Sequence, residues 1–266
     1  MAGAHLRIAA NTRTDEATRQ VVVFLALSFG IAALGTGIAI AAPAAGGIVP
    51  FLLALGPAVV AIVMAWREGS LGRLGATLAR RPTDRRWYAA LALPVIASLA
   101  VVPVAMALGQ PTTGILGSLT PAAVIIPLVV LVPAFAEELA WRGIALDGLL
   151  RTMSPLAAAL AIAVPWTAMH LVLYLPGQPY AGSALWPSII SVASLAVLTA
   201  WIYVGSGGSV LMAGLFHWLS NASTPLTWSV EPDVAWAVRA VIVAVLAIGV
   251  VALGGLRLPS REAVDG

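Results

Sequence analysis

Long apolar runs dominate this chain and constrain its fold more than any other feature. Between residues 20 and 256 they recur at about the length, roughly 20 residues, that an α-helix needs to cross a bilayer. The chain has 266 residues, of which 61% are hydrophobic and only 9% are charged, so one soluble core cannot hide this much apolar surface. The alternating segments of a β-barrel are missing from the sequence. The sequence therefore predicts an all-α, polytopic transmembrane helical bundle.

The apolar runs predict about eight membrane spans. The first run is too long for the core of a signal peptide, so we expect it to be retained as a span. No linker, low-complexity tract or internal repeat divides the sequence, which predicts a single integral membrane domain over residues 1–266. The predicted spans are 20–42, 48–66, 87–108, 120–141, 156–176, 186–204, 209–227 and 234–256.

The basic residues predict how the bundle is oriented. All of them are arginines, and we interpret their clustering at the ends of apolar runs as a topology pattern rather than a nucleic-acid surface. The connection 67–86 carries six arginines against two acids, so the positive-inside rule places it in the cytoplasm. Counting spans from there predicts a cell (plasma) membrane protein with both termini cytoplasmic. Arg257 and Arg261 then lie inside, and Glu231 and Asp233 lie outside.

Two adjacent carboxylates end a strongly apolar run. A charge at the centre of a transmembrane helix costs roughly 2.5–3.5 kcal/mol, so Glu137 and Glu138 at this depth require a function or a partner. Glu138 and Arg142 are four residues apart and share a helix face, whereas Glu137 is rotated by about 100°. We expect Glu138 to pair with Arg142. Glu137 is then left without a charged partner, as suits a general base.

Two further polar pairs have the same helical spacing. Trp166 and His170 are four apart, so the indole can lie over the imidazole, and His170 could donate to a bound water. His217 and Asn221, also four apart, place two donors on one face, where they could bind a developing oxyanion. A turn near residue 153 would put Glu137 and His170 at one height, about 25 Å from it. The sequence thus predicts that three helices converge on one polar site.

These motifs resemble those of a known family. Glu-Glu-x-x-x-Arg at 137–142, aromatic-x-x-x-His at 166–170 and His-x-x-x-Asn at 217–221 look like the motifs of the CPBP intramembrane proteases. That family includes type II CAAX prenyl proteases and bacteriocin-processing or self-immunity proteins, and is also called the Abi family. The similar core covers roughly residues 120–227. One departure is Trp166, where the family usually has phenylalanine.

The resemblance implies an endopeptidase that acts on a membrane-associated protein or peptide. It implies that Glu137 and His170 activate a water, that His217 and Asn221 stabilise the oxyanion, and that Glu138 and Arg142 support the site. Both metalloprotease and metal-free glutamate mechanisms have been argued for this family, and the sequence leaves the choice open. A zinc ion, if bound, would take Glu137, His170 and His217 as candidate ligands with a position open for water.

Other interpretations compete with this one. The glutamates could project into water at a helix end, and the histidines could serve packing or interhelical hydrogen bonding. A non-catalytic membrane scaffold or bacteriocin-immunity-type protein is then the alternative function, and a proton-coupled carrier is a third. The motifs of zinc site-2, rhomboid and aspartyl intramembrane proteases are missing from the sequence, and so is cysteine.

Overall fold

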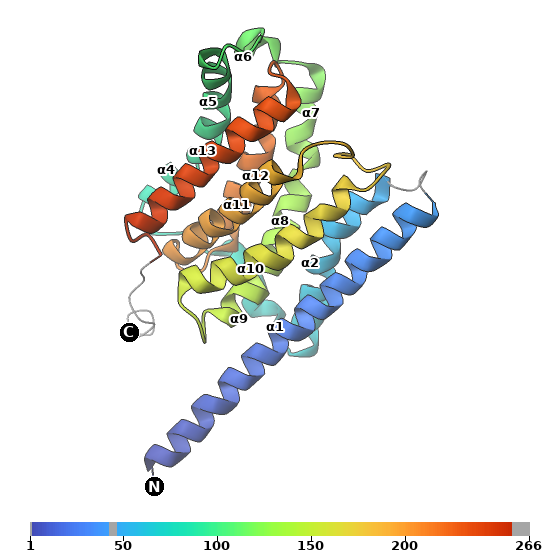
Figure 1. The fold of residues 1–266 in the computed structure, drawn as a ribbon. Helices are drawn as coiled ribbons and strands as arrows, with labels where there is room; N and C mark the ends of the chain where they lie inside the picture. The colour runs from blue at the N-terminus through green and yellow to red at the C-terminus, as the bar shows by residue number, and fades with distance from the viewer. Residues whose placement is uncertain (1, 43–46, 257–266) are drawn as a thin grey trace.

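A computed structural model describes residues 2–42 and 47–256, and this part of the chain contains helices and no strand (Figure 1). The all-α prediction is confirmed. Within the described residues, seven helical stretches are long and apolar enough to cross a membrane, and the chain is an integral membrane protein. The helices are α1 (Ala2–Ala41), α2 (Val49–Arg67), α3 (Leu71–Ala79), α4 (Arg86–Ala90), α5 (Leu93–Ala107), α6 (Gly114–Gly117), α7 (Pro121–Val129), α8 (Leu131–Ala140), η2 (Trp141–Leu146), α9 (Asp147–Leu149), α10 (Pro155–His170), η3 (Leu171–Tyr174), α11 (Leu185–Gly205), α12 (Val210–Ala222), η4 (Thr224–Thr227) and α13 (Pro232–Ala252).

The helix in the stretch predicted as the seventh span, 209–227, is shorter than the seven long helical stretches. Its helix α12 has 13 residues and is followed by the 3-10 turn η4. The break falls where Pro225 cannot continue an α-helix. With α12 counted beside the seven long stretches, the bundle is consistent with about eight predicted spans.

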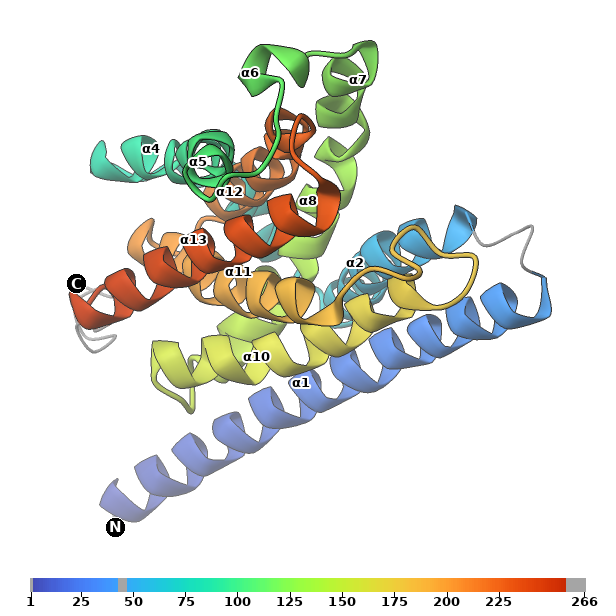
Figure 2. The same cartoon turned by 45° about the horizontal axis from the view of Figure 1, so that its top comes forward.

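Helix α12 lies inside the bundle. It packs against α8, α11 and α5, while α11 itself lies between α10 and α13 (Figures 1 and 2). Helix α1 runs along α2 on the outside of this arrangement. The central position of α12 brings its polar face against the carboxylates of α8.

The stretch predicted as the fourth span, 120–141, is broken between α7 and α8. Pro133 has no N–H to donate to the carbonyl of residue 129, and α7 ends at Val129. The carbonyl of Pro127, near this break, accepts a 2.8 Å hydrogen bond from the indole Nε1 of Trp218. The break is therefore tied to α12, the helix that carries His217.

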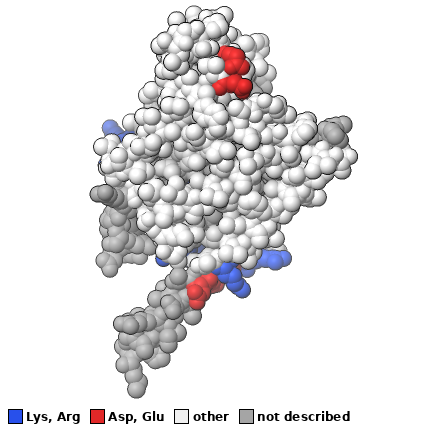
Figure 3. Space-filling model, viewed as in Figure 1, with Lys and Arg blue, Asp and Glu red and all other residues white. Residues whose placement is uncertain are grey.

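Most charged side chains on the face seen in Figure 3 lie near its upper and lower ends, and further basic atoms lie at its left edge. One acidic group lies near the upper end, where α13 begins with Glu231 as its N-cap and Asp233 in its first turn, and acidic atoms also lie beside the basic ones at the lower end. Arg257 and Arg261, expected at the cytoplasmic face, lie outside the described residues. Arg239 contradicts the expectation that arginines cluster at span ends, because it lies about two turns inside α13 and is buried.

Candidate active site

Glu138 and Arg142 form an ion pair in the interior of the bundle. Both side chains are fully buried, and Nε of Arg142 lies 3.0 Å from Oε2 of Glu138, with Nη1 donating to Oε1 at 3.0 Å. Arg142 also donates to the hydroxyl of Thr199 on α11. The arginine lies in η2, a π-helical turn that widens the helix just after the glutamates. Two buried charges at this depth contradict the idea of a helix end projecting into water.

His217 joins this pair from α12. Its Nδ1 lies 2.9 Å from Oε1 of Glu138, and since a carboxylate only accepts, Nδ1 is the donor. Close helix packing makes this contact possible: a Cβ on Gly214 would lie 2.6 Å from Cδ1 of Phe135 on α8. With Nδ1 engaged, Nε2 is the ring nitrogen that can meet a substrate. Donation from Nε2 to an oxyanion therefore requires protons on both ring nitrogens.

Trp166 contacts the other polar groups of the site. Its Nε1 donates a 2.8 Å hydrogen bond to Oε2 of Glu137. Its ring centroid lies 5.4 Å from that of His217, in an edge contact, and the guanidinium of Arg142 lies 4.5 Å above it. Among the described residues no basic side chain forms an ion pair with Glu137, but the indole supplies it with a hydrogen-bond donor, which a phenylalanine at this position would not.

His170 is oriented by the same tryptophan. Its Nδ1 lies 2.8 Å from the backbone oxygen of Trp166 and donates to it, so in the neutral ring Nε2 carries the lone pair. The two rings meet edge to face at 80°, 5.7 Å apart, rather than lying one over the other as the sequence suggested. His170 is thereby held with a basic nitrogen free to point away from its own helix.

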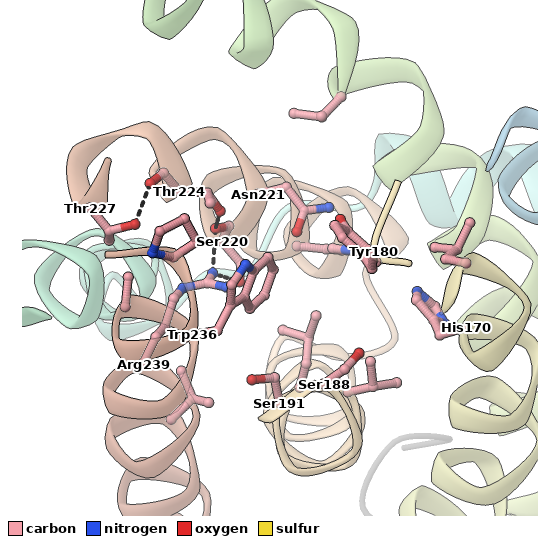
Figure 4. A pocket seen from close by; sticks show the side chains of 18 of the residues that line it. His170, Tyr180, Ser188, Ser191, Ser220, Asn221, Thr224, Thr227, Trp236 and Arg239 are labelled. Carbon is pink, nitrogen blue, oxygen red and sulfur yellow. Dashed lines mark hydrogen bonds between the residues drawn. The ribbon is translucent and has the colours of Figure 1, made fainter. Parts of the chain in front are cut away.

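One cavity brings these groups together. Its volume is about 580 Å³, within the range of small-molecule and peptide sites, and residues of α8, α10, α11, α12 and α13 line it (Figure 4). Glu137, His170, His217 and Asn221 all line this cavity, whereas Glu138 and Arg142 lie behind it. The three predicted helices do converge, and the two fully buried charges support His217 from outside the cavity.

The three candidate metal ligands do not form a three-ligand site. Among residues 2–42 and 47–256, no three His, Cys, Asp or Glu side chains are grouped so that they could hold a metal ion. Each candidate already has a protein partner: Glu137 bonds to the indole of Trp166, His170 to its carbonyl, and His217 to Glu138. A catalytic zinc takes three protein ligands, so this arrangement does not fit one.

Several polar residues that line the cavity were not predicted from the sequence, and Arg239 and Tyr180 are the two largest of them. Arg239 should have been noticed, because an arginine inside a predicted span is as costly as a glutamate there. Tyr180 lies in the connection between η3 and α11, and no sequence pattern distinguishes it from other loop residues. Burial raises the pKa of its phenol, Tyr174 raises it further and Arg239 lowers it, so Tyr180 is a neutral hydroxyl at physiological pH.

Comparison with known proteins agrees with the motifs. Residues 118–223 match the family described as type II CAAX prenyl endopeptidase Rce1-like, and this stretch contains the three motifs. A curated relative, CAAX prenyl protease 2 from Methanococcus maripaludis, is 26% identical over 126 residues, or 42% of this chain. The match spans 46% of that relative, about half its length. The resemblance of this chain to the CPBP intramembrane proteases is thus confirmed over the segment that carries its polar site.

Proposed function

We propose that this protein is an intramembrane endopeptidase that hydrolyses a peptide bond of a membrane-associated protein or peptide. One observation carries the proposal. Glu137, His170, His217 and Asn221 line a single cavity inside an apolar bundle, where polar groups without a function are costly. The match to a type II CAAX prenyl endopeptidase family supports the same class of reaction.

In the proposed reaction Glu137 is the general base. A water positioned between Glu137 and Nε2 of His170 attacks the peptide carbonyl carbon, and its proton moves to Glu137. The resulting oxyanion accepts hydrogen bonds from Asn221 and from doubly protonated His217. When the C–N bond breaks, Glu137 returns the proton to the leaving amine. Because the candidate ligands do not form a three-ligand site, no step of this scheme uses a metal ion.

Glu138 and Arg142 act as supporting residues in this scheme. Glu138 accepts the Nδ1 proton of His217 and fixes which ring nitrogen faces the cavity, while Arg142 balances the negative charge of Glu138. Residues 120–227 form the catalytic core of a single membrane domain. The positive-inside rule gives the proposed orientation in the plasma membrane, with both termini on the cytoplasmic side.

The direct test measures cleavage by the full chain reconstituted in lipid nanodiscs, with fluorogenic peptides carrying a lipid anchor. We expect Glu137→Gln and His170→Ala to lower kcat by at least about a hundredfold, since general acid–base catalysis contributes roughly 10²–10⁴. Glu231→Gln, which changes a carboxylate at the N-cap of α13, is the matched control and should keep most of the activity. Unchanged cleavage by both Glu137→Gln and His170→Ala would contradict the proposed function.

The alternative is a membrane scaffold or immunity-type protein that keeps this site for structure. Complementation separates the two functions. A scaffold should retain its phenotype when Glu137 becomes Gln, because glutamine still accepts the hydrogen bond from Trp166. A protease should lose its phenotype with the same change.

A further inference from the structure

Arg239 is a buried cation in the wall of the same cavity. It is 6% exposed, lies about two turns inside α13, and its guanidinium carbon is 5.9 Å from the ring centroid of Trp236 (Figure 4). Its Nη2 donates to the backbone oxygen of Ser220 at 2.5 Å and to the hydroxyl of Ser220 at 2.8 Å. Both acceptors are uncharged.

The contacts with Ser220 satisfy only part of the hydrogen-bonding capacity of this arginine. The Ser220 carbonyl belongs to the last turn of α12, so Arg239 caps that helix end, where a cation is favourable. A guanidinium has five N–H donors, however, and the buried Nε of Arg239 has no hydrogen-bond partner. Across the described residues, no carboxylate lies within ion-pair distance of it. Arg142, the other buried arginine of the site, has Glu138.

The cavity that Arg239 lines is rich in hydroxyl groups and poor in acids. Among the residues that line the cavity, Glu137 is the one carboxylate, and it already bonds to Trp166. The hydroxyl of Ser191 on α11 also lines the cavity and is buried without a hydrogen-bond partner (Figure 4). Arg239 and Ser191, two residues that line one cavity, thus each carry a buried polar atom without a partner, which indicates a polar ligand because buried polar groups are normally hydrogen-bonded.

We infer that Arg239 binds a carboxylate of the peptide substrate, with the hydroxyl of Ser191 as a second donor. This inference rests on the proposed peptidase function and adds a specificity-determining residue to it. A planar carboxylate matches the fork of guanidinium donors and supplies the missing negative charge. The same chemistry is offered by a terminal α-carboxylate and by an Asp or Glu side chain.

The test measures equilibrium binding to the full chain in nanodiscs of phosphatidylcholine, followed by tryptophan fluorescence. Three otherwise identical peptides are compared: one with a free C-terminal acid, one with a C-terminal amide, and one amide peptide with an internal glutamate. We expect at least one carboxylate peptide to bind about ten- to a hundredfold tighter than the uncharged amide, as suits a hydrogen bond to a charged group. The peptide that is preferred identifies the source of the carboxylate.

Variants then assign the preference to a residue. Arg239→Gln should lower the affinity for the carboxylate peptide to that of the amide peptide, and Arg239→Lys should restore part of the preference. Ser191→Ala should reduce the preference a few-fold. Arg86→Gln is the matched control, because Arg86 is exposed, pairs with Asp84 and lies outside the cavity. Thermal unfolding of each variant shows that it is folded.

Three results would overturn the inference. The unchanged protein could bind the three peptides equally or not at all, or the carboxylate preference could survive in Arg239→Gln. The third result is that phosphatidylglycerol in the nanodisc competes with the peptides and abolishes any preference among them. The last result would assign the site to a lipid phosphate. Because binding needs no turnover, the two proposals fail separately. A carboxylate preference without cleavage contradicts the peptidase function alone, whereas cleavage without a preference contradicts the role of Arg239 alone.

Discussion

The indole Nε1 of Trp166 donates a 2.8 Å hydrogen bond to Oε2 of Glu137, the proposed base. The donor and the acceptor come from α10 and α8, so this contact fixes the carboxylate relative to the helix that carries His170. The Trp166 carbonyl also orients that histidine. One side chain and its backbone thus set the geometry of both groups proposed to activate water.

Trp166→Phe should keep the packing of the site and remove this hydrogen bond. We expect kcat to fall about ten- to a hundredfold, since a hydrogen bond to a charged group contributes roughly 1.5–3 kcal/mol. Cleavage of an anchored peptide measures the effect. Trp186→Phe, an exposed tryptophan outside the cavity, is the control. If both variants cleave equally well, the indole N–H has no role in positioning Glu137.

Arg142→Gln should destabilise the protein far more than Arg151→Gln. Both arginines pair with an acid four residues earlier at 3.0 Å, but the Glu138 pair is fully buried and the Asp147 pair is more than one-third exposed. Leaving a buried charge unpaired costs about 3–5 kcal/mol, whereas an exposed pair contributes about 0–1 kcal/mol. Thermal unfolding in detergent compares them. Similar losses in both variants would contradict the burial argument.

Gly214→Ala should separate α12 from α8 and weaken the contact between His217 and Glu138. A Cβ at this position meets the ring of Phe135, and such overpacking costs about 1–3 kcal/mol. Activity should fall with stability, and Phe135→Leu should restore part of both. Gly249→Ala is the control, because a Cβ there meets nothing within 4 Å, and alanine should stabilise α13 slightly. A tolerated Gly214→Ala would show that the helices can shift without harm.

Chelation should leave the activity intact. The candidate ligands Glu137, His170 and His217 do not group into a three-ligand site, so we expect purified, active protein to contain well under one equivalent of zinc. Elemental analysis and cleavage assays with and without a strong chelator measure this. Loss of activity that returns with added zinc would require these side chains to rearrange around a metal.

The sequence predicted contacts within one helix better than contacts between helices. Spacing by four residues gave the Glu138 pair with Arg142, because neighbours on a helix face follow from the helical period. The contacts of Trp166 with Glu137 and of His217 with Glu138 join different helices, and their formation depends on how each helix is rotated against its neighbour. The helical period within one sequence stretch does not determine that rotation.

The boundaries of the spans show a similar limit. Hydropathy predicted the apolar stretches, and the all-helical bundle follows from them. Hydropathy also predicted 209–227 as an ordinary span, although Pro225 ends the helix early. Arg239 was not predicted, because it has no acid at helical spacing to mark it, as Glu138 marks Arg142. An arginine within a predicted span is as costly to insert as a glutamate, and it therefore also indicates a function or a partner.

The shortness of α12 also concerns the bilayer itself. Thirteen residues rise about 20 Å, whereas the hydrocarbon core is about 30 Å thick, so the helix that carries His217 and Asn221 is shorter than the core and depends on the residues after it, or on local thinning of the bilayer, to complete the span. Its last polar residues, Ser220 and Asn221, line the cavity of the candidate site. We therefore expect lipid tail length to affect the proposed reaction, because a thicker or thinner hydrocarbon core changes how a short helix is accommodated in the bilayer.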